Sequence, residues 1–150
     1  MKKEIWGFYP PPIGGISIYC KRLAEKLHAM DDGIVMRNFS QSVSRCKGVI
    51  DVKNRLVEFL KLPFVSKRII HAQFTNFYLL ALLYLFGWRH EIVLTLHNRR
   101  IVLLEGWKRW VVNRLFGRAK RIIYNDPTYT AKLREKYDID EEKIVLLPTY

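Results

Sequence analysis

The alternation of two apolar patterns constrains the fold of this chain more than any other feature. Short, uninterrupted apolar runs alternate with longer segments in which apolar residues recur at every third and fourth position. Runs without in/out alternation are typical of strands in a parallel sheet, whose two faces are both covered by helices. We therefore expect an α/β fold, with a doubly wound, mostly parallel sheet of six to seven strands and helices on both faces. The expected strands are residues 4–9, 34–39, 68–72, 92–96, 121–126 and 142–148.

The segments between these strands carry helix start and stop signals. Thr75 or Asn76 can cap a helix that Gly87 ends, Pro63 ends an earlier helix, and Pro127 suits a first helical turn. The expected helices are residues 16–30, 50–62, 77–86, 105–119 and 127–137, with a polar loop over 41–48. A length of 150 residues suits one compact domain, so we expect a single Rossmann-like domain over residues 1–150.

The stretch YPPPIGGISIYCKRLAEKL joins the first strand to the first helix. Prolines stiffen this loop, and Gly14 and Gly15 remove side chains where a ligand would approach the main chain. A helix N-terminus attracts anions, so we expect an anionic group, such as a phosphate, near Gly14, Gly15 and Ile16. The alternative is a tight turn without a ligand. The loop matches neither the GxGxxG dinucleotide fingerprint nor a P-loop, which weakens the case for a nicotinamide cofactor or ATP.

Two histidines end consecutive strands, His71 in IIHAQ and His97 in LTLHN. Because the C-terminal ends of parallel strands meet at one edge, we expect both near Gly14 and Gly15. His97 is the candidate catalytic residue. The candidate substrate-binding residues are His71, Asn98 and Asn125. Packed or surface histidines are the alternative, and no His, Cys or carboxylate spacing indicates a metal site.

Positive charge is the strongest feature of the composition, with 26 Lys and Arg against 14 Asp and Glu and a net charge of +12. A basic excess indicates phosphate-bearing partners, on a lipid surface, a nucleic acid or a nucleotide. The charge concentrates around the fourth helix, where tryptophans interrupt the basic residues. The expected membrane or anion face is Trp107, Arg109, Trp110, Arg114, Lys120 and Arg121. A solvated charged face is the alternative, and the fingerprints of RRM and KH domains are absent from the sequence.

Other sequence features bear on the compartment. Cys20 and Cys46 lack metal-ligand spacing and a CxxC motif, which indicates a reduced, cytoplasmic chain. The longest apolar run, residues 77–88, is shorter than the roughly 18 residues that a membrane-spanning helix needs. We expect a cytoplasmic protein that can lie peripherally on the inner face of the cell membrane.

Taken in order, YPPPIGGISIYCKRLAEKL, IIHAQF, IVLTLHN, AKRIIYND and EKIVLLPTY resemble the N-terminal half of retaining GT-B glycosyltransferases of the group 1, family 4 type. The resemblance implies two Rossmann-like domains that face a cleft. The N-terminal domain mainly holds the acceptor, and the C-terminal domain holds most of the nucleotide-sugar. It further implies that Gly14 and Gly15 lie near the donor diphosphate and that His97 lies near the transferring sugar.

The resemblance also implies partners and limits. The donor is a nucleotide-diphosphate sugar, the acceptor is a glycan or lipid-linked molecule of polysaccharide or glycolipid biosynthesis, and neither a metal nor a tightly bound cofactor is needed. The family's donor-binding glutamate pair is absent, and LLPTY resembles an interdomain linker. We therefore expect the C-terminal nucleotide-sugar-binding domain to be absent from this chain, and the chain alone to be inactive. The alternative is a non-catalytic basic α/β module on an anionic membrane or nucleic acid.

Overall fold

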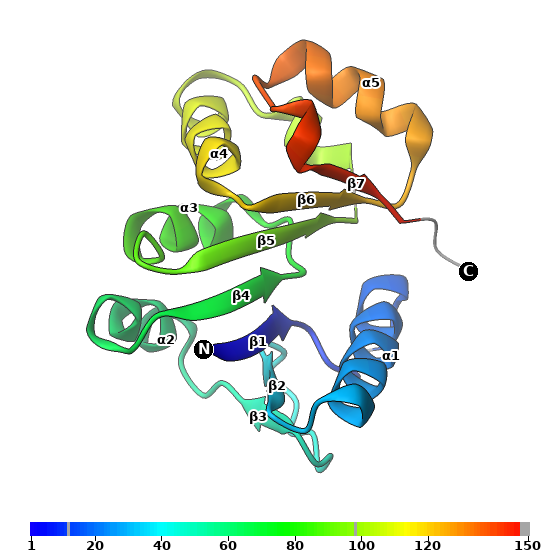
Figure 1. The fold of residues 1–150 in the computed structure, drawn as a ribbon, viewed down its shortest axis with the longest axis vertical. Coiled ribbons are helices and arrows are strands. Elements are labelled where there is room, and N and C mark those ends of the chain that lie inside the picture. The colour runs from blue at the N-terminus through cyan, green and yellow to red at the C-terminus, as the bar shows by residue number, and fades with distance from the viewer. Residues whose placement is uncertain (12, 98, 148–150) are drawn as a thin grey trace.

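A seven-stranded parallel sheet organises the chain in the computed structural model, which describes residues 1–11, 13–97 and 99–147 (Figure 1). The strand order is β3-β2-β1-β4-β5-β6-β7, and each neighbouring pair is parallel. The strands are β1 (Lys2–Gly7), β2 (Ile34–Asn38), β3 (Val49–Asp51), β4 (Arg68–Ala72), β5 (Glu91–Leu96), β6 (Arg121–Tyr124) and β7 (Ile144–Leu146). The predicted α/β, Rossmann-like fold is confirmed.

Within the described residues, five α-helices and three short 3₁₀ turns connect the strands. They are α1 (Gly15–Met30), α2 (Arg55–Lys61), η1 (Leu62–Phe64), α3 (Phe77–Phe86), η2 (Arg99–Leu103), α4 (Gly106–Arg118), α5 (Pro127–Lys136) and η3 (Glu141–Lys143). The side chains of Asn54, Asn76 and Asp126 cap α2, α3 and α5 by accepting hydrogen bonds from backbone N–H groups. Gly87 follows the end of α3, as the sequence predicts.

The prediction of a helix over residues 50–62 is wrong in its first third. Val49–Asp51 forms strand β3, which pairs with β2, and α2 begins only at Arg55, after its cap Asn54. The apolar spacing of this segment fits a helix as well as a strand. Pairing with the exposed edge of β2 decides between them, since β-branched Val49 and Ile50 suit a pleated strand. The first strand is also shifted, because it ends at Gly7 and not at Tyr9.

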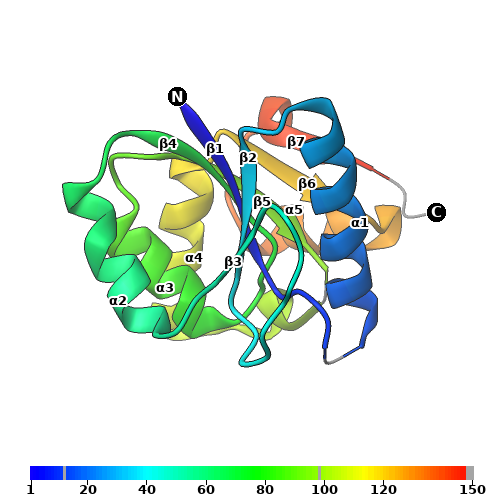
Figure 2. The ribbon, with the colours of Figure 1, turned by 90° about the horizontal axis from the view of Figure 1, so that it is seen from below.

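Helices cover the two faces of the sheet unequally (Figure 2). Helix α1 lies on one face, and α2, α3 and α4 lie on the opposite face. We call these the α1 face and the α2–α4 face. The α2–α4 face buries a continuous core that includes Trp6, Phe59, Leu80, Leu94 and Phe116. The α1 face has a separate, smaller cluster of Ile5, Tyr9, Cys20, Ala24 and Met36. Among the described residues, no helix has both the length and the apolar character needed to cross a bilayer.

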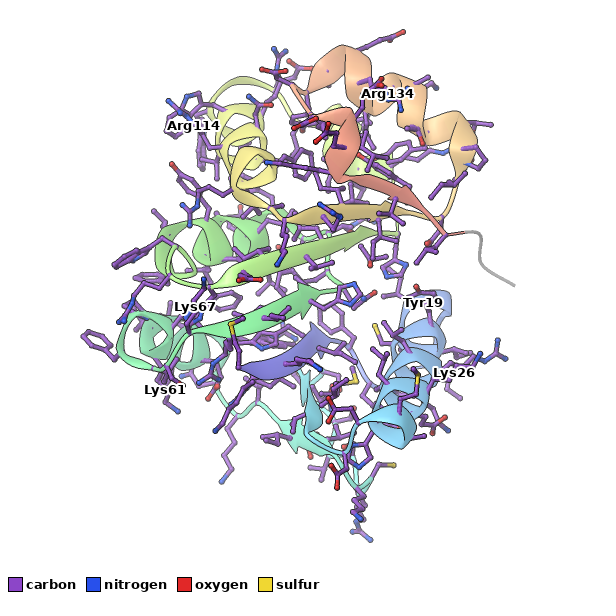
Figure 3. The ribbon with its side chains drawn as sticks, viewed as in Figure 1. Tyr19, Lys26, Lys61, Lys67, Arg114 and Arg134 are labelled. Atoms are coloured by element: carbon purple, nitrogen blue, oxygen red, sulfur yellow. The ribbon has the colours of Figure 1, made fainter. Side chains whose placement is uncertain are left out.

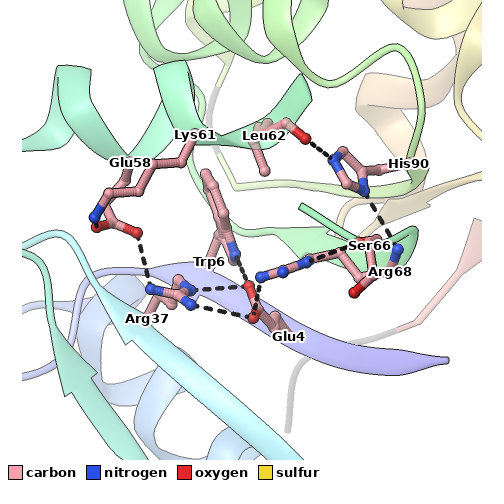
Figure 4. A network of polar contacts seen from close by, with 9 residues as sticks. All are labelled: Glu4, Trp6, Arg37, Glu58, Lys61, Leu62, Ser66, Arg68 and His90. Carbon is pink, nitrogen blue, oxygen red and sulfur yellow. Dashed lines mark hydrogen bonds and ion pairs between the residues drawn. The ribbon is translucent and has the colours of Figure 1, made fainter. Parts of the chain in front are cut away.

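A buried carboxylate ties β1 to its neighbours (Figure 4). Glu4 is 6% exposed and accepts hydrogen bonds from Arg68 Nη1 at 2.6 Å, Arg37 Nε at 2.9 Å and Trp6 Nε1 at 2.8 Å. Burial alone would raise the pKa of Glu4, but the hydrogen bonds from Arg37 and Trp6 and the charges of Arg37 and Arg68 outweigh it and lower the pKa. Glu4 therefore stays ionised and holds β1, β2 and β4 together.

Candidate functional site

Polar side chains gather on the α1 face of the sheet, toward the C-terminal ends of β4, β5 and β6. Residues two apart on a strand share a face, so His71 and Gln73 lie on one side of β4, and Thr95 and His97 lie on the same side of β5. Asn125 follows the last residue of β6. We call these five residues the polar row: His71, Gln73, Thr95, His97 and Asn125.

The side-chain amide of Gln73 links both histidines. Gln73 is 0% exposed; its Nε2 lies 2.7 Å from His71 Nε2 and 3.2 Å from Thr95 Oγ1, and its Oε1 lies 2.8 Å from His97 Nε2. Thr95 Oγ1 is 2.7 Å from His71 Nε2, and Asn125 Nδ2 is 3.2 Å from His97 Nδ1. The polar row is therefore one continuous chain of hydrogen bonds.

Both histidine rings are neutral at pH 7. Burial lowers the pKa of His71 to about 4, with a smaller contribution from the nearby His97. Burial also lowers the pKa of His97 to about 4. In the folded protein, neither ring can therefore supply a proton as an imidazolium near neutral pH.

Helix α1 brings the loop that contains Gly14 and Gly15, here called the glycine loop, to the same edge. The ring of Tyr19, in the first turns of α1, packs edge-on against His97 with 4.9 Å between the ring centroids. Tyr19 lies at the end of α1 that is nearest the ends of β5 and β6 (Figure 3). Since α1 begins at Gly15, one turn before Tyr19, the structure places Gly14, Gly15 and His97 at one edge of the sheet. This is the arrangement that the sequence predicts.

A cavity of about 510 Å³ opens at the glycine loop. Its lining residues are Phe8, Ile13, Gly14, Gly15, Ile16, Ser17, Ser40, Gln41 and Arg55. A second cavity of about 500 Å³ shares Ser40, Gln41 and Arg55 with it and extends along the end of β3. The Arg55 guanidinium lies 5.7 Å from the centroid of the Phe8 ring, and its Nε donates to the carbonyl of Phe39 at 3.0 Å. A fixed positive charge thus borders both cavities, whereas His97 meets α1 through Tyr19 and does not line either one.

The chain's own packing does not require glycine at positions 14 and 15. A Cβ atom on Gly15 would have no atom within 4 Å, and one on Gly14 would meet only Ser17 Oγ at 4.0 Å. Neither residue has a positive φ; Gly14 is extended, with φ −161°. Gly7 differs, because a Cβ there would lie 2.9 Å from Cys20 Sγ and 3.0 Å from Gln73 Cβ. The open space at Gly14 and Gly15 leaves room for a molecule from outside the chain to approach the backbone.

The start of α1 is suited to an anion. Its first turn contains no acidic residue, and the N-terminus of a helix of this length carries a partial positive charge. Ser17 Oγ accepts from the N–H of Gly14 at 2.9 Å and so fixes the first turn. Together with Arg55 across the cavity, these groups favour a negatively charged ligand.

Several residues of the candidate site are not predicted from the sequence. Gln73 could have been found from period two, because it follows His71 by two residues on the same strand. Arg55 is missed because the helix that contains it is predicted to begin at residue 50, five residues too early. Tyr19 and Thr95 have no signal beyond their apolar or strand pattern. Asn98 lies outside the described residues.

The basic surface differs from the predicted one. Trp107 and Trp110 are exposed on α4, and the Arg114 guanidinium lies 5.4 Å from the Trp110 ring centroid. Arg109 is exposed on the same helix, and Figure 3 shows Arg114 on its outer side. Lys120 and Arg121 do not belong to this surface, because α4 ends at Arg118.

The positions of Lys120 and Arg121 follow from the end of α4 at Arg118 and the start of β6 at Arg121. Lys120 pairs with Glu91 at 2.7 Å at the opposite, N-terminal edge of the sheet, and Arg121 is the first residue of β6. The expectation that both lie on one face with Arg109 and Arg114 is wrong, because Ala119 is already extended. Elsewhere, the described residues contain no group of three or more His, Cys, Asp or Glu side chains that could hold a metal ion.

Comparison with known proteins finds one matching family and several solved structures of similar fold. The model of the family described as Glycosyltransferase Family 4 matches residues 51–149. Comparison with curated proteins gave no match. Among solved structures, Alr3699/HepE of Anabaena in complex with UDP has a TM-score of 0.68 at 14% identity. The complex with UDP and glucose has 0.65 at 12%, and the complex with UDP-glucose has 0.67 at 13%.

These likenesses cover nearly all of this chain but only part of HepE. The complex with UDP aligns with 99% of this chain and 44% of the HepE chain, and the complex with UDP-glucose aligns with 97% and 43%. The chain therefore spans less than half of HepE. At these identities the structural likeness shows the fold alone.

Proposed function

Because this chain belongs to Glycosyltransferase Family 4, we propose that it is the N-terminal, acceptor-side domain of a glycosyltransferase. In this proposal, the enzyme moves a sugar from a nucleotide-diphosphate donor to a glycan or lipid-linked acceptor, with retention of configuration. HepE, which shares the fold, forms complexes with UDP and UDP-glucose, which supports a donor of this class. The proposed nucleotide-sugar-binding domain lies outside residues 1–150.

The main observation behind this proposal is the open space around the backbone of Gly14 and Gly15. Positively charged groups around that approach, namely the α1 N-terminus and Arg55, suit the diphosphate of a donor or an anionic part of an acceptor. Fixed dipoles and charges of this kind stabilise the negative charge that develops on a leaving diphosphate. The proposed role of this loop is therefore charge stabilisation through the backbone, without a side chain in the way.

His97 has a different proposed role. Its two ring nitrogens are bonded to Gln73 and Asn125, and its pKa of about 4 keeps it neutral. We assign it to the wall of the cleft beside the transferring sugar, where it acts by shape and hydrogen bonding and does not donate a proton. His71 and Asn125 support it from within the polar row.

Calorimetric titration with UDP-glucose tests the glycine loop. We expect Gly15→Val to weaken binding at least tenfold, because the side chain would occupy the space where the ligand approaches the backbone. Gly117→Val is the matched control, since a Cβ on Gly117 also meets nothing within 4 Å but lies on α4. Equal affinities for the two variants would refute the proposed site. Sugar transfer by the 150-residue chain alone would contradict the assignment of the donor domain to another part of the protein.

A second proposal concerns the surface of α3 and α4. Within the described residues, neither helix carries an acidic side chain, while Lys108, Arg109, Arg114 and Arg118 are all on α4. Exposed Trp107 and Trp110 lie among them. Tryptophan within a basic face suits the headgroup region of an anionic bilayer, so we propose that the enzyme docks peripherally on a membrane through α4.

Co-sedimentation with vesicles that contain phosphatidylglycerol tests this docking. The double variant Trp107→Ala/Trp110→Ala should lose most of the bound fraction, and rising salt should release the wild-type protein. Phe64→Ala is the control, because Phe64 is also an exposed aromatic residue but lies on η1. Binding that ignores both salt and the tryptophans would exclude α4 as the docking surface. Salt-sensitive binding to RNA in preference to vesicles would favour the nucleic-acid module.

A further inference from the structure

The amide of Gln73 makes complementary contacts with two histidine rings. One ring nitrogen, His71 Nε2, faces the amide nitrogen at 2.7 Å, and the corresponding atom of the other ring, His97 Nε2, faces the amide oxygen at 2.8 Å. An amide nitrogen only donates, and an amide oxygen only accepts. Since Gln73 is fully buried, water does not substitute for either contact.

These contacts assign opposite tautomers to the two rings. His71 Nε2 accepts, so its proton sits on Nδ1, while His97 Nε2 donates, so its Nδ1 is bare and accepts from Asn125 Nδ2. The assignment is complementary whichever way the amide lies. If the oxygen and nitrogen of Gln73 exchanged places, His71 would donate from Nε2 and His97 would accept at Nε2.

Asn125 cannot fix the tautomer of His97 by itself. Its Oδ1 is buried and has no hydrogen-bond partner among the described residues. Turning the Asn125 amide over would therefore sacrifice no bond of Oδ1 and would offer an acceptor to a protonated Nδ1. Thr95 and His71, by contrast, both contact the Gln73 amide nitrogen, and so they link Gln73 to the interior of the sheet.

We propose that Gln73 is a positioning residue that couples His71 to His97, so that the interior of the sheet sets which edge of the His97 ring accepts hydrogen bonds at the rim. This inference rests on the proposed function, in which His97 lines the sugar cleft. With Nε2–H turned inward, His97 Nδ1 accepts from Asn125 Nδ2, and Asn125 Oδ1 remains buried without a partner among the described residues.

Nitrogen-15 NMR of the histidine rings at pH 7.5 tests the coupling without any substrate. In the wild-type chain we expect His97 to carry its proton on Nε2 and His71 to carry it on Nδ1. His90 is an internal reference with backbone partners, because its Nδ1 accepts from the Arg68 N–H at 3.3 Å and its Nε2 donates to the Leu62 carbonyl at 2.9 Å. The same tautomer in His71 and His97 would overturn the proposal.

Two variants of Gln73 separate coupling from mere support. In Gln73→Glu, an ionised carboxylate only accepts, so both histidines should carry a proton on Nε2 and become alike. In Gln73→Met, the link is removed and the His97 ring shifts should move toward an average of the two tautomers. Unchanged His71 ring shifts in Gln73→Glu, or unchanged His97 ring shifts in Gln73→Met, would overturn the proposal.

The control is Asn38→Leu, which removes another amide that is 0% exposed, from β2. It should reduce stability while leaving the His97 and His71 tautomers as in the wild type. A change of the His97 tautomer in Asn38→Leu would show that general loosening, and not Gln73, governs the ring. Because these measurements use no nucleotide-sugar, their failure is distinguishable from failure of the proposed transferase activity, which the UDP-glucose titration reports.

Discussion

The two faces of the sheet differ in their side chains: the α2–α4 face is packed with apolar residues, and the α1 face carries the polar row. On the α2–α4 face, the side chains of β4 are buried, whereas on the α1 face Ile69 and His71 of the same strand are only partly buried. The first face fills with aromatic and aliphatic side chains that are fixed by packing. The second face carries the polar row, which is dry enough to keep two histidines neutral and close enough to the edge to meet a ligand. Because successive side chains of a strand point to opposite faces, residues that pack the core and residues of the candidate site alternate along the same strand.

The largest expected effect lies in the core of the α2–α4 face. Phe59→Ala should lower the free energy of unfolding by about 4 kcal/mol, because the buried ring packs against Trp6, Phe39 and Phe74 and its loss leaves a cavity. Urea denaturation measures this change. Phe64→Ala, at a site 88% exposed, should change it by no more than about 0.5 kcal/mol. Equal losses would mean that the core is not where the structure puts it.

Breaking the Glu4 network comes next. Glu4→Ala should cost about 3 kcal/mol in the same assay, because it leaves the buried Arg68 guanidinium and Trp6 Nε1 without their partner. The neighbouring variant Lys3→Ala removes an exposed pair with Asp31 and should cost between about 0 and 1 kcal/mol. A loss at Glu4 no greater than that at Lys3 would contradict the buried network.

Acidification should lower the free energy of unfolding through His71 and His97 on the α1 face. The folded pKa of His71 and of His97 is about 4, below the unfolded value of 6.5, so the unfolded chain takes up protons first. Above pH 6.5 the free energy of unfolding is therefore not reduced by either ring. It falls as the pH decreases toward 4, by about 1.5 kcal/mol per ring between pH 6.5 and 5. The variant His71→Phe should show a shallower decline over that range. A decline as steep as in the wild type would show that His71 is not kept neutral by burial.

The smallest effects compare two glycines of the α1 face. Gly15→Ala should stabilise the chain by about 0.4–1 kcal/mol, since its Cβ meets open space at a helix start. Gly7→Ala should destabilise it by about 1 kcal/mol, since its Cβ would press on Cys20 Sγ and Gln73 Cβ. Thermal unfolding of both variants gives the two signs. Destabilisation by Gly15→Ala would show that the loop is already closely packed by its own chain.

The elements with strong local signals were predictable. The strand over residues 68–72 and the helix between Asn76 and Gly87 agree with the structure, because their caps and apolar runs decide them locally. Strand β3 was not predictable, because three residues gain their structure only by pairing with β2. The site was half predictable. Strand ends located His97 and the glycine loop, but the bridging role of Gln73 depends on side chains of two strands that meet only in the folded sheet.

Mapping the ligand site by amide shifts tests the central division between the faces most directly. UDP-glucose added to the nitrogen-15-labelled chain should shift the backbone amides of Gly14, Gly15, Ile16 and His97, and leave those of α3 and α4 in place. Shifts confined to the helices of the α2–α4 face, or no shift at the glycine loop at saturating ligand, would contradict the assignment of chemistry to the α1 face.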